Sequence, residues 1–309
     1  MSKAPRFHRS ISGILLLDKA LGVSSNAALQ QVRALFSAAK AGHAGSLDPL
    51  ASGLLPVCFG QATKVCGRLL NSAKTYRVLV QLGQRTESGD GETEVVERAT
   101  VPPLDERLVD AALATFLGEQ DQVPPMHSAL KFEGKRLYEL ARRGESVELE
   151  PRRIVIHRIA RVRLGADELE LDVGCSKGTY IRTLAADVAA RLGTLGYVRG
   201  LRRLSVDPFG GLPMYTLDQL SERPPEARDA LLLPPDQAFP DLPRVELAGA
   251  AVEGLLQGRT VVALQPAAAG ELRAYDDRGR FLGMVQGAPD GRVRPIRLFV
   301  EVGAGGSRP

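Results

Sequence analysis

The chain has 309 residues, of which 44% are hydrophobic, and its formal net charge at pH 7 is +4. This length suits two domains with packed cores, and no apolar run is long enough to span a bilayer. The apolar run at 14–17 ends at Asp18 and Lys19, which excludes a signal peptide, and three cysteines without a CxxC pair predict neither disulfides nor a zinc site. We therefore expect a cytoplasmic protein with buried thiols.

The first predicted elements alternate between strand and helix. Residues 14–17 have the composition of a short buried strand. Ser25-Asn26 offers an N-cap, and the apolar residues that follow recur at helical spacing, which predicts a helix that stops before Gly42. Residues 54–59 are predicted to form a strand and residues 62–70 a short helix.

A loop with unusual composition lies between this helix and strand. Residues 42–53 place one imidazole, His43, and one carboxylate, Asp48, among three glycines and a proline. Asp48 precedes Pro49, so helical dihedral angles are disfavoured there, and the glycines allow bends that a side chain would block. The pattern predicts a shaped loop, neither helix nor plain strand, that holds one aspartate in a fixed direction. On this pattern alone, a simple surface turn is the alternative.

The middle of the chain predicts an α+β domain. Strands are expected at 76–82, 154–164, 169–175 and 197–206, and helices from Pro102-Pro103 to near Gly118 and from 180 to 192, closed by Gly193. The strands alternate in polarity more than the strands of a buried parallel sheet do. A mixed, largely antiparallel sheet is therefore predicted.

The composition of the chain predicts two domains joined by a linker. Residues 1–220 form the predicted main domain, and residues 221–244 are rich in proline and predict a linker with one short helix. Residues 245–302 carry short apolar pairs between turns rich in glycine and aspartate, which predicts a small β-rich domain. Residues 303–309 are expected to be a disordered tail.

Positive charge is concentrated in one segment. Residues 124–163 contain ten Lys or Arg against five Glu, a net charge of +5, so the rest of the chain is nearly neutral. Such a block suggests contact with a polyanion. An ordinary solvated face is the alternative reading of the same charges.

The loop at 42–53, together with Leu54-Leu55-Pro56-Val57-Cys58, resembles the catalytic motif of the TruB family of tRNA pseudouridine synthases. The family pattern is Gly-His-x-Gly-x-Leu-Asp-Pro-x-Ala-x-Gly-Leu-Leu, and every named position matches. Ser46 replaces a common threonine, and Ala20 stands where Lys-Pro is usual. The resemblance implies a pseudouridine-synthase fold, with 245–302 similar to an RNA-binding PUA domain.

Two further motifs support the resemblance and imply catalytic residues. Lys74-Thr75-Tyr76 matches the family's Lys-x-Tyr, which places Tyr76 against the target base and makes it a candidate for proton transfer. Cys-Ser-Lys-Gly-Thr-Tyr-Ile-Arg at 175–182 matches a second motif, which places Arg182 beside the nucleophile Asp48. A cation within a few ångströms of a carboxyl lowers its pKa by about one to three units.

The resemblance also implies residues that bind the substrate. His43 would occupy space vacated by a flipped base, with a loop-stabilising hydrogen bond as its alternative role. Leu201 would pack against the base, or would be an ordinary core residue. The basic segment at about 124–153 would be an RNA-gripping insertion that orders on binding. The remaining substrate-binding residues implied are Tyr180, Lys64, Lys19 and Lys131.

The implied reaction is isomerisation of uridine to pseudouridine in the T-loop of tRNA, at the position conventionally numbered 55. It consumes no electrons, phosphate or water, so we expect no cofactor and no metal. The expected partner is the T-stem-loop of tRNA, with no membrane and a monomeric enzyme. The alternatives are a glycosidase, which normally needs a second carboxylate, a non-catalytic tRNA-binding or RNA-folding protein, and a guide-RNA-dependent pseudouridine synthase.

Overall fold

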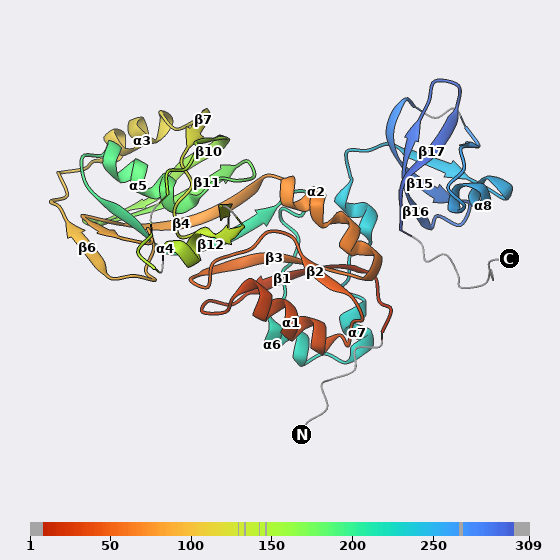
Figure 1. Ribbon diagram of the computed structural model, residues 1–309, viewed down its shortest axis with the longest axis horizontal. Helices are drawn as coiled ribbons and strands as arrows, with labels where there is room; N and C mark the ends of the chain where they lie inside the picture. The colour runs from red at the N-terminus through yellow and green to blue at the C-terminus, as the bar shows by residue number, and fades with distance from the viewer. Residues whose placement is uncertain are drawn as a thin grey trace.

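The computed structural model describes residues 9–299, except for 129, 133, 142, 146, 266 and 267. An eight-stranded sheet dominates it, in the order β1-β3-β12-β4-β11-β10-β7 with β2 paired to β3 (Figure 1). Its strands are β1 (Gly13–Lys19), β2 (Ala41–His43), β3 (Ala51–Phe59), β4 (Lys74–Leu82), β7 (Gly118–Gln122), β10 (Arg152–Leu164), β11 (Glu168–Cys175) and β12 (Gly196–Val206). Among the described strands of this sheet, β3 and β12 pair in parallel and the other pairs are antiparallel. The predicted α+β class and mixed, largely antiparallel sheet are confirmed.

The two ends of this sheet are covered differently. Near β1, alternate residues enter opposite cores. Leu15 and Leu17 pack with α1 (Ser25–Leu35), whereas Ile14 and Leu16 pack with the residues of η1 (Gly60–Val65) and α2 (Cys66–Asn71). At the other end, α3 (Glu106–Ala114) and α5 (Ile181–Arg191) lie together against β10 and β12, as Figure 1 shows. Successive side chains of a strand point to opposite faces. Because a core lies on each face of β1, both sets of its side chains are apolar.

Helix boundaries follow local capping chemistry. Ser24 accepts a hydrogen bond from the amide of Ala27 and caps α1. Asp105 accepts one from the amide of Leu108, so α3 begins at Glu106 and the prediction that Pro102-Pro103 opens this helix is wrong. Gly193, with φ of +80°, ends α5 as predicted.

Two further expectations needed correction. The predicted helix at 62–70 is split into a 3₁₀ turn, η1, followed by α2. The segment 42–53 is not entirely loop, since His43 ends the short strand β2 and Ala51 begins β3. Both strands pair within the main sheet, and this pairing overrides the local preference of the glycines for turns.

A second, five-stranded sheet forms a separate lobe, drawn in blue in Figure 1. It holds β13 (Arg244–Leu247), β14 (Val261–Val262), β15 (Gly270–Asp276), β16 (Phe281–Gly287) and β17 (Arg292–Leu298), together with α8 (Ala250–Leu256). This lobe has its own buried cluster, which includes Val245, Leu272 and Val285. A small β-rich unit at the C-terminal end is therefore present, and the tail at 303–309 lies outside the described residues.

The proline-rich segment between the sheets is partly structured. It contains two helical segments, α7 (Pro225–Asp229) and η2 (Pro235–Ala238), whereas the sequence predicted one. Helix α6 (Leu217–Ser221) precedes it. Ile14 and Leu233 exchange backbone hydrogen bonds of 2.8 and 2.9 Å, which fasten the segment to β1.

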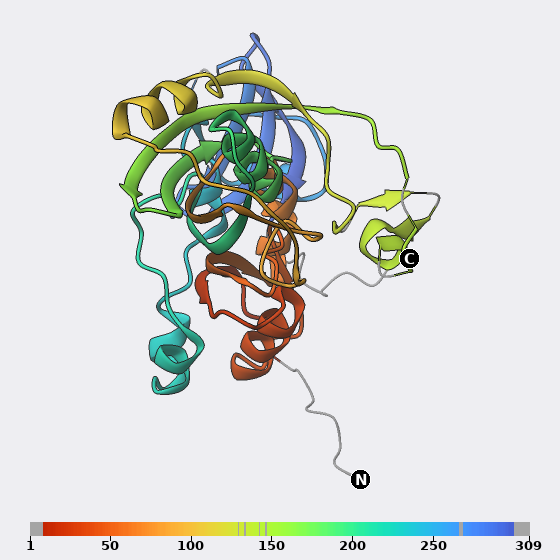
Figure 2. The same cartoon turned by 90° about the vertical axis from the view of Figure 1, so that its left-hand side faces the viewer.

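Two small hairpins extend from the main sheet. One consists of β5 (Gln84–Thr86) and β6 (Val95–Arg98). The other, β8 (Lys131–Phe132) and β9 (Lys135–Arg136), leads into α4 (Leu137–Ala141) and projects beyond the sheet as the yellow-green arm of Figure 2. In the described part of the chain, no helix is long and apolar enough to cross a membrane.

Candidate active site

The loop that carries Asp48 is anchored by hydrogen bonds at several points. Ser25, buried at the start of α1, accepts from the amide of Leu47 (2.7 Å) and donates to its carbonyl oxygen (2.9 Å). The amide of Gly22 donates to the carbonyl oxygen of Pro49 (2.8 Å). The Asp48 side chain itself is 48% exposed. The backbone is thus held on both sides of a carboxylate that is half buried.

Arg203 of β12 ties this loop to the sheet. Sequence reasoning did not select it as a site residue, although it lies in the Leu-x-Arg segment at 201–203. Its side chain is only 1% exposed, with Nε donating to the carbonyl oxygen of Leu54 (2.7 Å) and Nη2 to that of Gly45 (2.9 Å). Gly53 has φ of +98°, and a Cβ there would lie 2.2 Å from the carbonyl oxygen of Arg203. The motif glycine at 53 is therefore required by close backbone contact.

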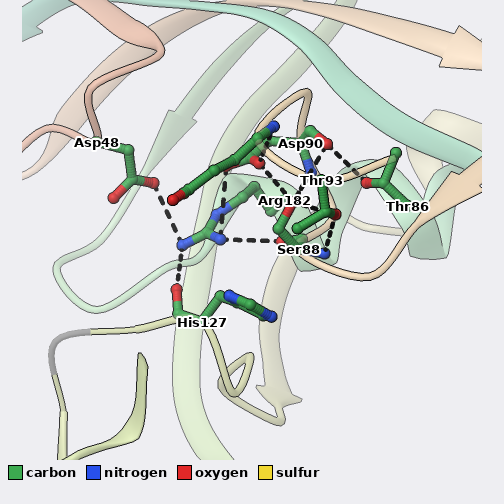
Figure 3. Close-up of polar contacts among 8 residues, drawn as sticks. Asp48, Thr86, Ser88, Asp90, Thr93, His127 and Arg182 are labelled. Carbon is green, nitrogen blue, oxygen red and sulfur yellow. Dashed lines mark hydrogen bonds and ion pairs between the residues drawn. The ribbon is translucent and has the colours of Figure 1, made fainter. Parts of the chain in front are cut away.

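Arg182 brings four segments together, as Figure 3 shows. Its guanidinium reaches Asp48 (Nη2 to Oδ2, 3.2 Å) and Asp90 (Nη1 to Oδ2, 3.6 Å). Nη1 also donates to the carbonyl oxygen of Ser88 (2.9 Å), and Nη2 to that of His127 (2.6 Å). Arg182 is only 7% exposed, and its contacts with Asp90, Ser88 and His127 fix its position. Asp48 therefore pairs with a cation that the rest of the fold holds in place.

A hydrogen-bonded loop holds the second carboxylate on Arg182 (Figure 3). Ser88 Oγ donates to Asp90 Oδ1 (2.6 Å), Thr86 Oγ1 donates to the carbonyl oxygen of Asp90 (2.6 Å), and the amide of Glu92 donates to Asp90 Oδ1 (2.9 Å). Sequence reasoning did not select Asp90 as a site residue. The signal was the Thr-x-Ser-x-Asp spacing at 86–90, in which the polar side chains satisfy one another within a tight turn.

The electrostatics of Asp48 differ from the expectation. Burial of the carboxyl raises the pKa of Asp48, and this effect exceeds the lowering by Arg182; Asp90 and Glu92 raise it further, while Lys19 lowers it. The sequence predicted a pKa below the ordinary value because it showed the cation and not the desolvation or the second carboxylate. Arg182 therefore serves to limit the rise.

A pocket of about 220 Å³ opens beside Asp48. Its lining includes five residues selected from the sequence, namely Asp48, Tyr76, Tyr180, Arg182 and Leu201, together with Ser46, Leu47, Ser128, Thr179 and Ile181. Tyr76 comes from β4 and is 8% exposed, and burial raises the pKa of its phenol. This pocket combines a carboxylate, its cation and an aromatic side chain in one cavity.

The other predicted residues do not line this pocket. Lys19 is buried and donates to the carbonyl oxygens of Ala20 (2.9 Å) and Val23 (2.7 Å), and burial lowers its pKa to about 8. His43 has a buried Nδ1 without a hydrogen-bond partner, and burial lowers its pKa. Lys64 donates to the carbonyl oxygen of Leu298 (2.6 Å) in the second sheet.

For Lys131, the structure describes the backbone in β8, and the placement of its side chain is outside the described part. Among the described residues, no group of three or more His, Cys, Asp or Glu is placed to hold a metal ion.

Comparison with known proteins shows which family the chain resembles. The profile of the TruB family pseudouridylate synthase N-terminal domain matches residues 33–181, and that of the pseudouridine synthase II TruB C-terminal domain matches residues 243–299. A protein of Chromohalobacter salexigens named tRNA pseudouridine synthase B is 50% identical over 291 residues, which is 94% of each chain. One of the same name from Methylobacillus flagellatus is 47% identical and spans 96% of this chain and 98% of its own.

Solved structures show the same fold. The chain is similar to one in a crystal structure of a Cbf5-Nop10-Gar1 complex, with a TM-score of 0.71, 22% identity, and coverage of 93% of this chain and 85% of that one. The family profile and the relatives thus define an enzyme of the pseudouridine synthase class, an isomerase. The chain belongs to the TruB family of pseudouridylate synthases.

Proposed function

We propose that this protein converts uridine to pseudouridine at position 55 in the T-loop of tRNA, with Asp48 as the nucleophile. The observation that carries the proposal is the 3.2 Å pairing of Asp48 and Arg182 at a pocket that Tyr76 also lines. In the reaction, the C1′–N1 bond breaks, a C1′–C5 bond forms, and a proton leaves C5 while another is gained at N1. The names of the relatives support tRNA as the substrate.

The side chains of the pocket have distinct proposed tasks. Asp48 must be ionised to attack C1′ of the sugar or C6 of the base, and Arg182 favours the ionised form. Tyr76 stacks on the base that has been flipped out of the RNA, a step that costs a few kcal/mol. The phenol of Tyr76 is protonated at neutral pH, as in an ordinary tyrosine, and burial raises its pKa further.

The direct test is incubation of the enzyme with an unmodified T-arm hairpin, followed by a chemical readout specific for pseudouridine. The proposal predicts a single modified site at the T-loop uridine. A hairpin with cytidine at that position is the matched control. If the enzyme left the hairpin and a full-length unmodified tRNA unchanged, the proposed substrate would be wrong.

We also propose that the basic segment at 124–163, which includes the arm formed by β8, β9 and α4, binds RNA phosphates. Three arginines of the basic segment are paired with acids from neighbouring elements. Arg161 contacts Glu106 (2.8 Å), Arg163 contacts Glu168 (3.0 Å), and Arg153 lies 3.6 Å from Glu119. The net charge counted along the sequence therefore overstates the local positive field. Arg142, also in this segment, lies outside the described residues.

Arg143 and Arg152 are exposed and are absent from the ion pairs among described residues. Replacing both with Gln should weaken RNA binding at low salt and make the slope of log affinity against log salt shallower by ~0.7–0.9 for each lost phosphate contact. The matched control replaces Arg161 and Arg163 with Gln, which removes the same charge from paired positions. Equal slopes for the wild type and the Arg143/Arg152 variant would show that the basic segment is an ordinary solvated face.

The second sheet is proposed to be a separate RNA-binding unit, with boundaries near residues 244 and 302. Deleting residues 245–309 should raise the Kd for tRNA and leave turnover on saturating T-arm hairpin within a few-fold of wild type. The pocket residues all precede Pro213, which supports this expectation. Turnover and Kd are measured on the same preparation.

This deletion needs a control for folding. Met284 and Phe299 of the second sheet pack into the core beside Ile14, so the truncated protein loses apolar contacts and should melt at a lower temperature. A full-length variant with the exposed residues Arg294 and Arg297 changed to Gln retains this apolar packing, although it loses the 3.4 Å hydrogen bond from Arg297 to the carbonyl oxygen of Lys64, and it should still weaken tRNA binding. A folded truncation that makes no pseudouridine at high RNA concentration would show that the second sheet completes the active site.

A further inference from the structure

The hydroxyl of Ser128 is an unused polar group in the active-site pocket. Ser128 lines the same pocket as Asp48 and Tyr76, and it is only 5% exposed. Its Oγ is buried and has no hydrogen-bond partner. Of the buried unpartnered side-chain atoms found among the described residues, it is the one whose residue lines this pocket.

The position of Ser128 is coupled to that of the proposed nucleophile. Arg182 Nη2 donates to the carbonyl oxygen of His127 (2.6 Å), and the same nitrogen lies 3.2 Å from Asp48 Oδ2. The amide of Ser128 donates to the carbonyl oxygen of Met126 (2.9 Å), which turns the chain at this point. One guanidinium nitrogen thus holds both Asp48 and the backbone next to Ser128.

Leaving this hydroxyl without a partner is unfavourable. Burial removes a polar group from water without replacing the lost hydrogen bond, so such a group in a native protein calls for an explanation. Two neighbouring polar side chains of the pocket are already engaged by other partners. Thr179 Oγ1 donates to the carbonyl oxygen of Ser176 (3.1 Å), and Arg182 is bound to the backbone and two carboxylates. A ligand atom in the pocket would supply the missing partner for Ser128.

We propose that Ser128 Oγ donates a hydrogen bond to a carbonyl oxygen of the flipped uracil and orients the ring for the isomerisation. This inference rests on the proposed function. Uracil carries carbonyl oxygens O2 and O4 on either side of N3. Turning the ring about the N3–C6 axis exchanges N1 with C5 and also O2 with O4. A hydroxyl that meets one carbonyl oxygen before the turn therefore meets the other after it.

This geometry also gives Ser128 a role in selecting the base. Cytosine carries an amino group in place of O4, so it presents a carbonyl oxygen on one side only. The same donor bond would then be lost either before or after the turn. Ser128 is thus assigned as a specificity-determining and positioning residue.

The test combines a side-chain change with atomic changes in the RNA. Wild type and Ser128→Ala are compared on T-arm hairpins that carry uracil, 2-thiouracil or 4-thiouracil at the target position. On uracil, Ser128→Ala should lower kcat/KM about tenfold or more through loss of one buried hydrogen bond. Sulfur accepts hydrogen bonds poorly. Replacing the carbonyl oxygen that Ser128 contacts, O2 or O4, with sulfur should therefore lower the rate of the wild type. The same replacement should not lower the rate of Ser128→Ala further, because this variant has already lost the hydrogen bond.

Controls separate this role from a structural one. Ser221→Ala removes a hydroxyl at an exposed position whose Oγ donates to the carbonyl oxygen of Asp218, and it should match wild type on all three hairpins. Ser128→Thr retains the hydroxyl and should keep more activity than Ser128→Ala. Thermal melting shows whether each variant is folded.

The outcomes are distinguishable. If both thio-substitutions lowered the rates of wild type and Ser128→Ala by the same factor, or if Ser128→Ala matched wild type on uracil, the assignment of Ser128 would be wrong and the proposed function would stand. If wild type made no pseudouridine in the uracil hairpin, the proposed function would fall, and the inference would fall with it.

Discussion

Replacing Asp48 with Asn is expected to abolish pseudouridine formation while RNA binding stays nearly intact. The amide is similar in shape to the carboxylate and carries no nucleophilic oxygen anion, so the chemical step should slow by at least about a thousandfold. Affinity should change little, because contacts to the phosphate backbone dominate binding to RNA. Single-turnover formation of pseudouridine and the Kd for the T-arm hairpin measure the two effects separately.

Asp277→Asn is the matched control for this experiment. It makes the same change at an exposed carboxylate in the turn between β15 and β16, away from the pocket, and should keep wild-type turnover. Because Asp48 is itself about half exposed, Asp48→Asn should melt close to the wild-type temperature. Residual activity of Asp48→Asn within tenfold of wild type would remove Asp48 from the nucleophilic role.

The parts of the site that could be predicted are local in sequence. The loop at 42–53 carries its own conformational signals, since Pro49 disfavours helix and Gly53 permits a positive φ. The strand that bears Tyr76 has alternating burial, and Gly193 ends α5. Each of these signals acts within a few residues, so one sequence contains them.

The contacts that assemble the site were not predictable in the same way. Ser88 and Arg182 are separated by 94 residues, and Leu54 and Arg203 by 149. Nothing in the local spacing of Arg203 shows that its guanidinium lies under the loop of Asp48. The register of β12 against β3 and β4 decides this, and that register depends on the whole sheet.

The net charge counted along the basic segment also overestimates the positive charge that is free to bind RNA. Arg161 belongs to the basic segment, yet its partners Glu106 and Asp110 come from α3, which precedes the segment. The pKa of Asp48 illustrates the same point, because its largest cause is burial, a property of the folded chain. A sequence shows which charges exist, and only the fold shows which of them are paired or desolvated.

Replacing Arg182 with Ala is expected to lower turnover by about a hundredfold or more, in a pH-dependent manner. Arg182 opposes the rise in the pKa of Asp48, so its removal raises that pKa further. Because the ionised carboxylate is the proposed nucleophile, the acid limb of the kcat profile should move to higher pH. Activity lost at low pH should then be partly recovered as the pH is raised.

Arg182→Lys should restore only part of the rate, because a lysine carries the charge and lacks the planar fork that also binds the carbonyl oxygens of Ser88 and His127. The matched control is Arg77→Ala, which breaks an ion pair with Asp172 (2.6 Å) on the same sheet outside the pocket. Removing Arg182 also leaves Asp90 buried without its cation, so melting temperatures of all three variants are needed to separate lost stability from lost chemistry. If folded Arg182→Ala kept the wild-type rate and the same acid limb, the carboxylate would not depend on its cation and the ion-pair proposal would fail.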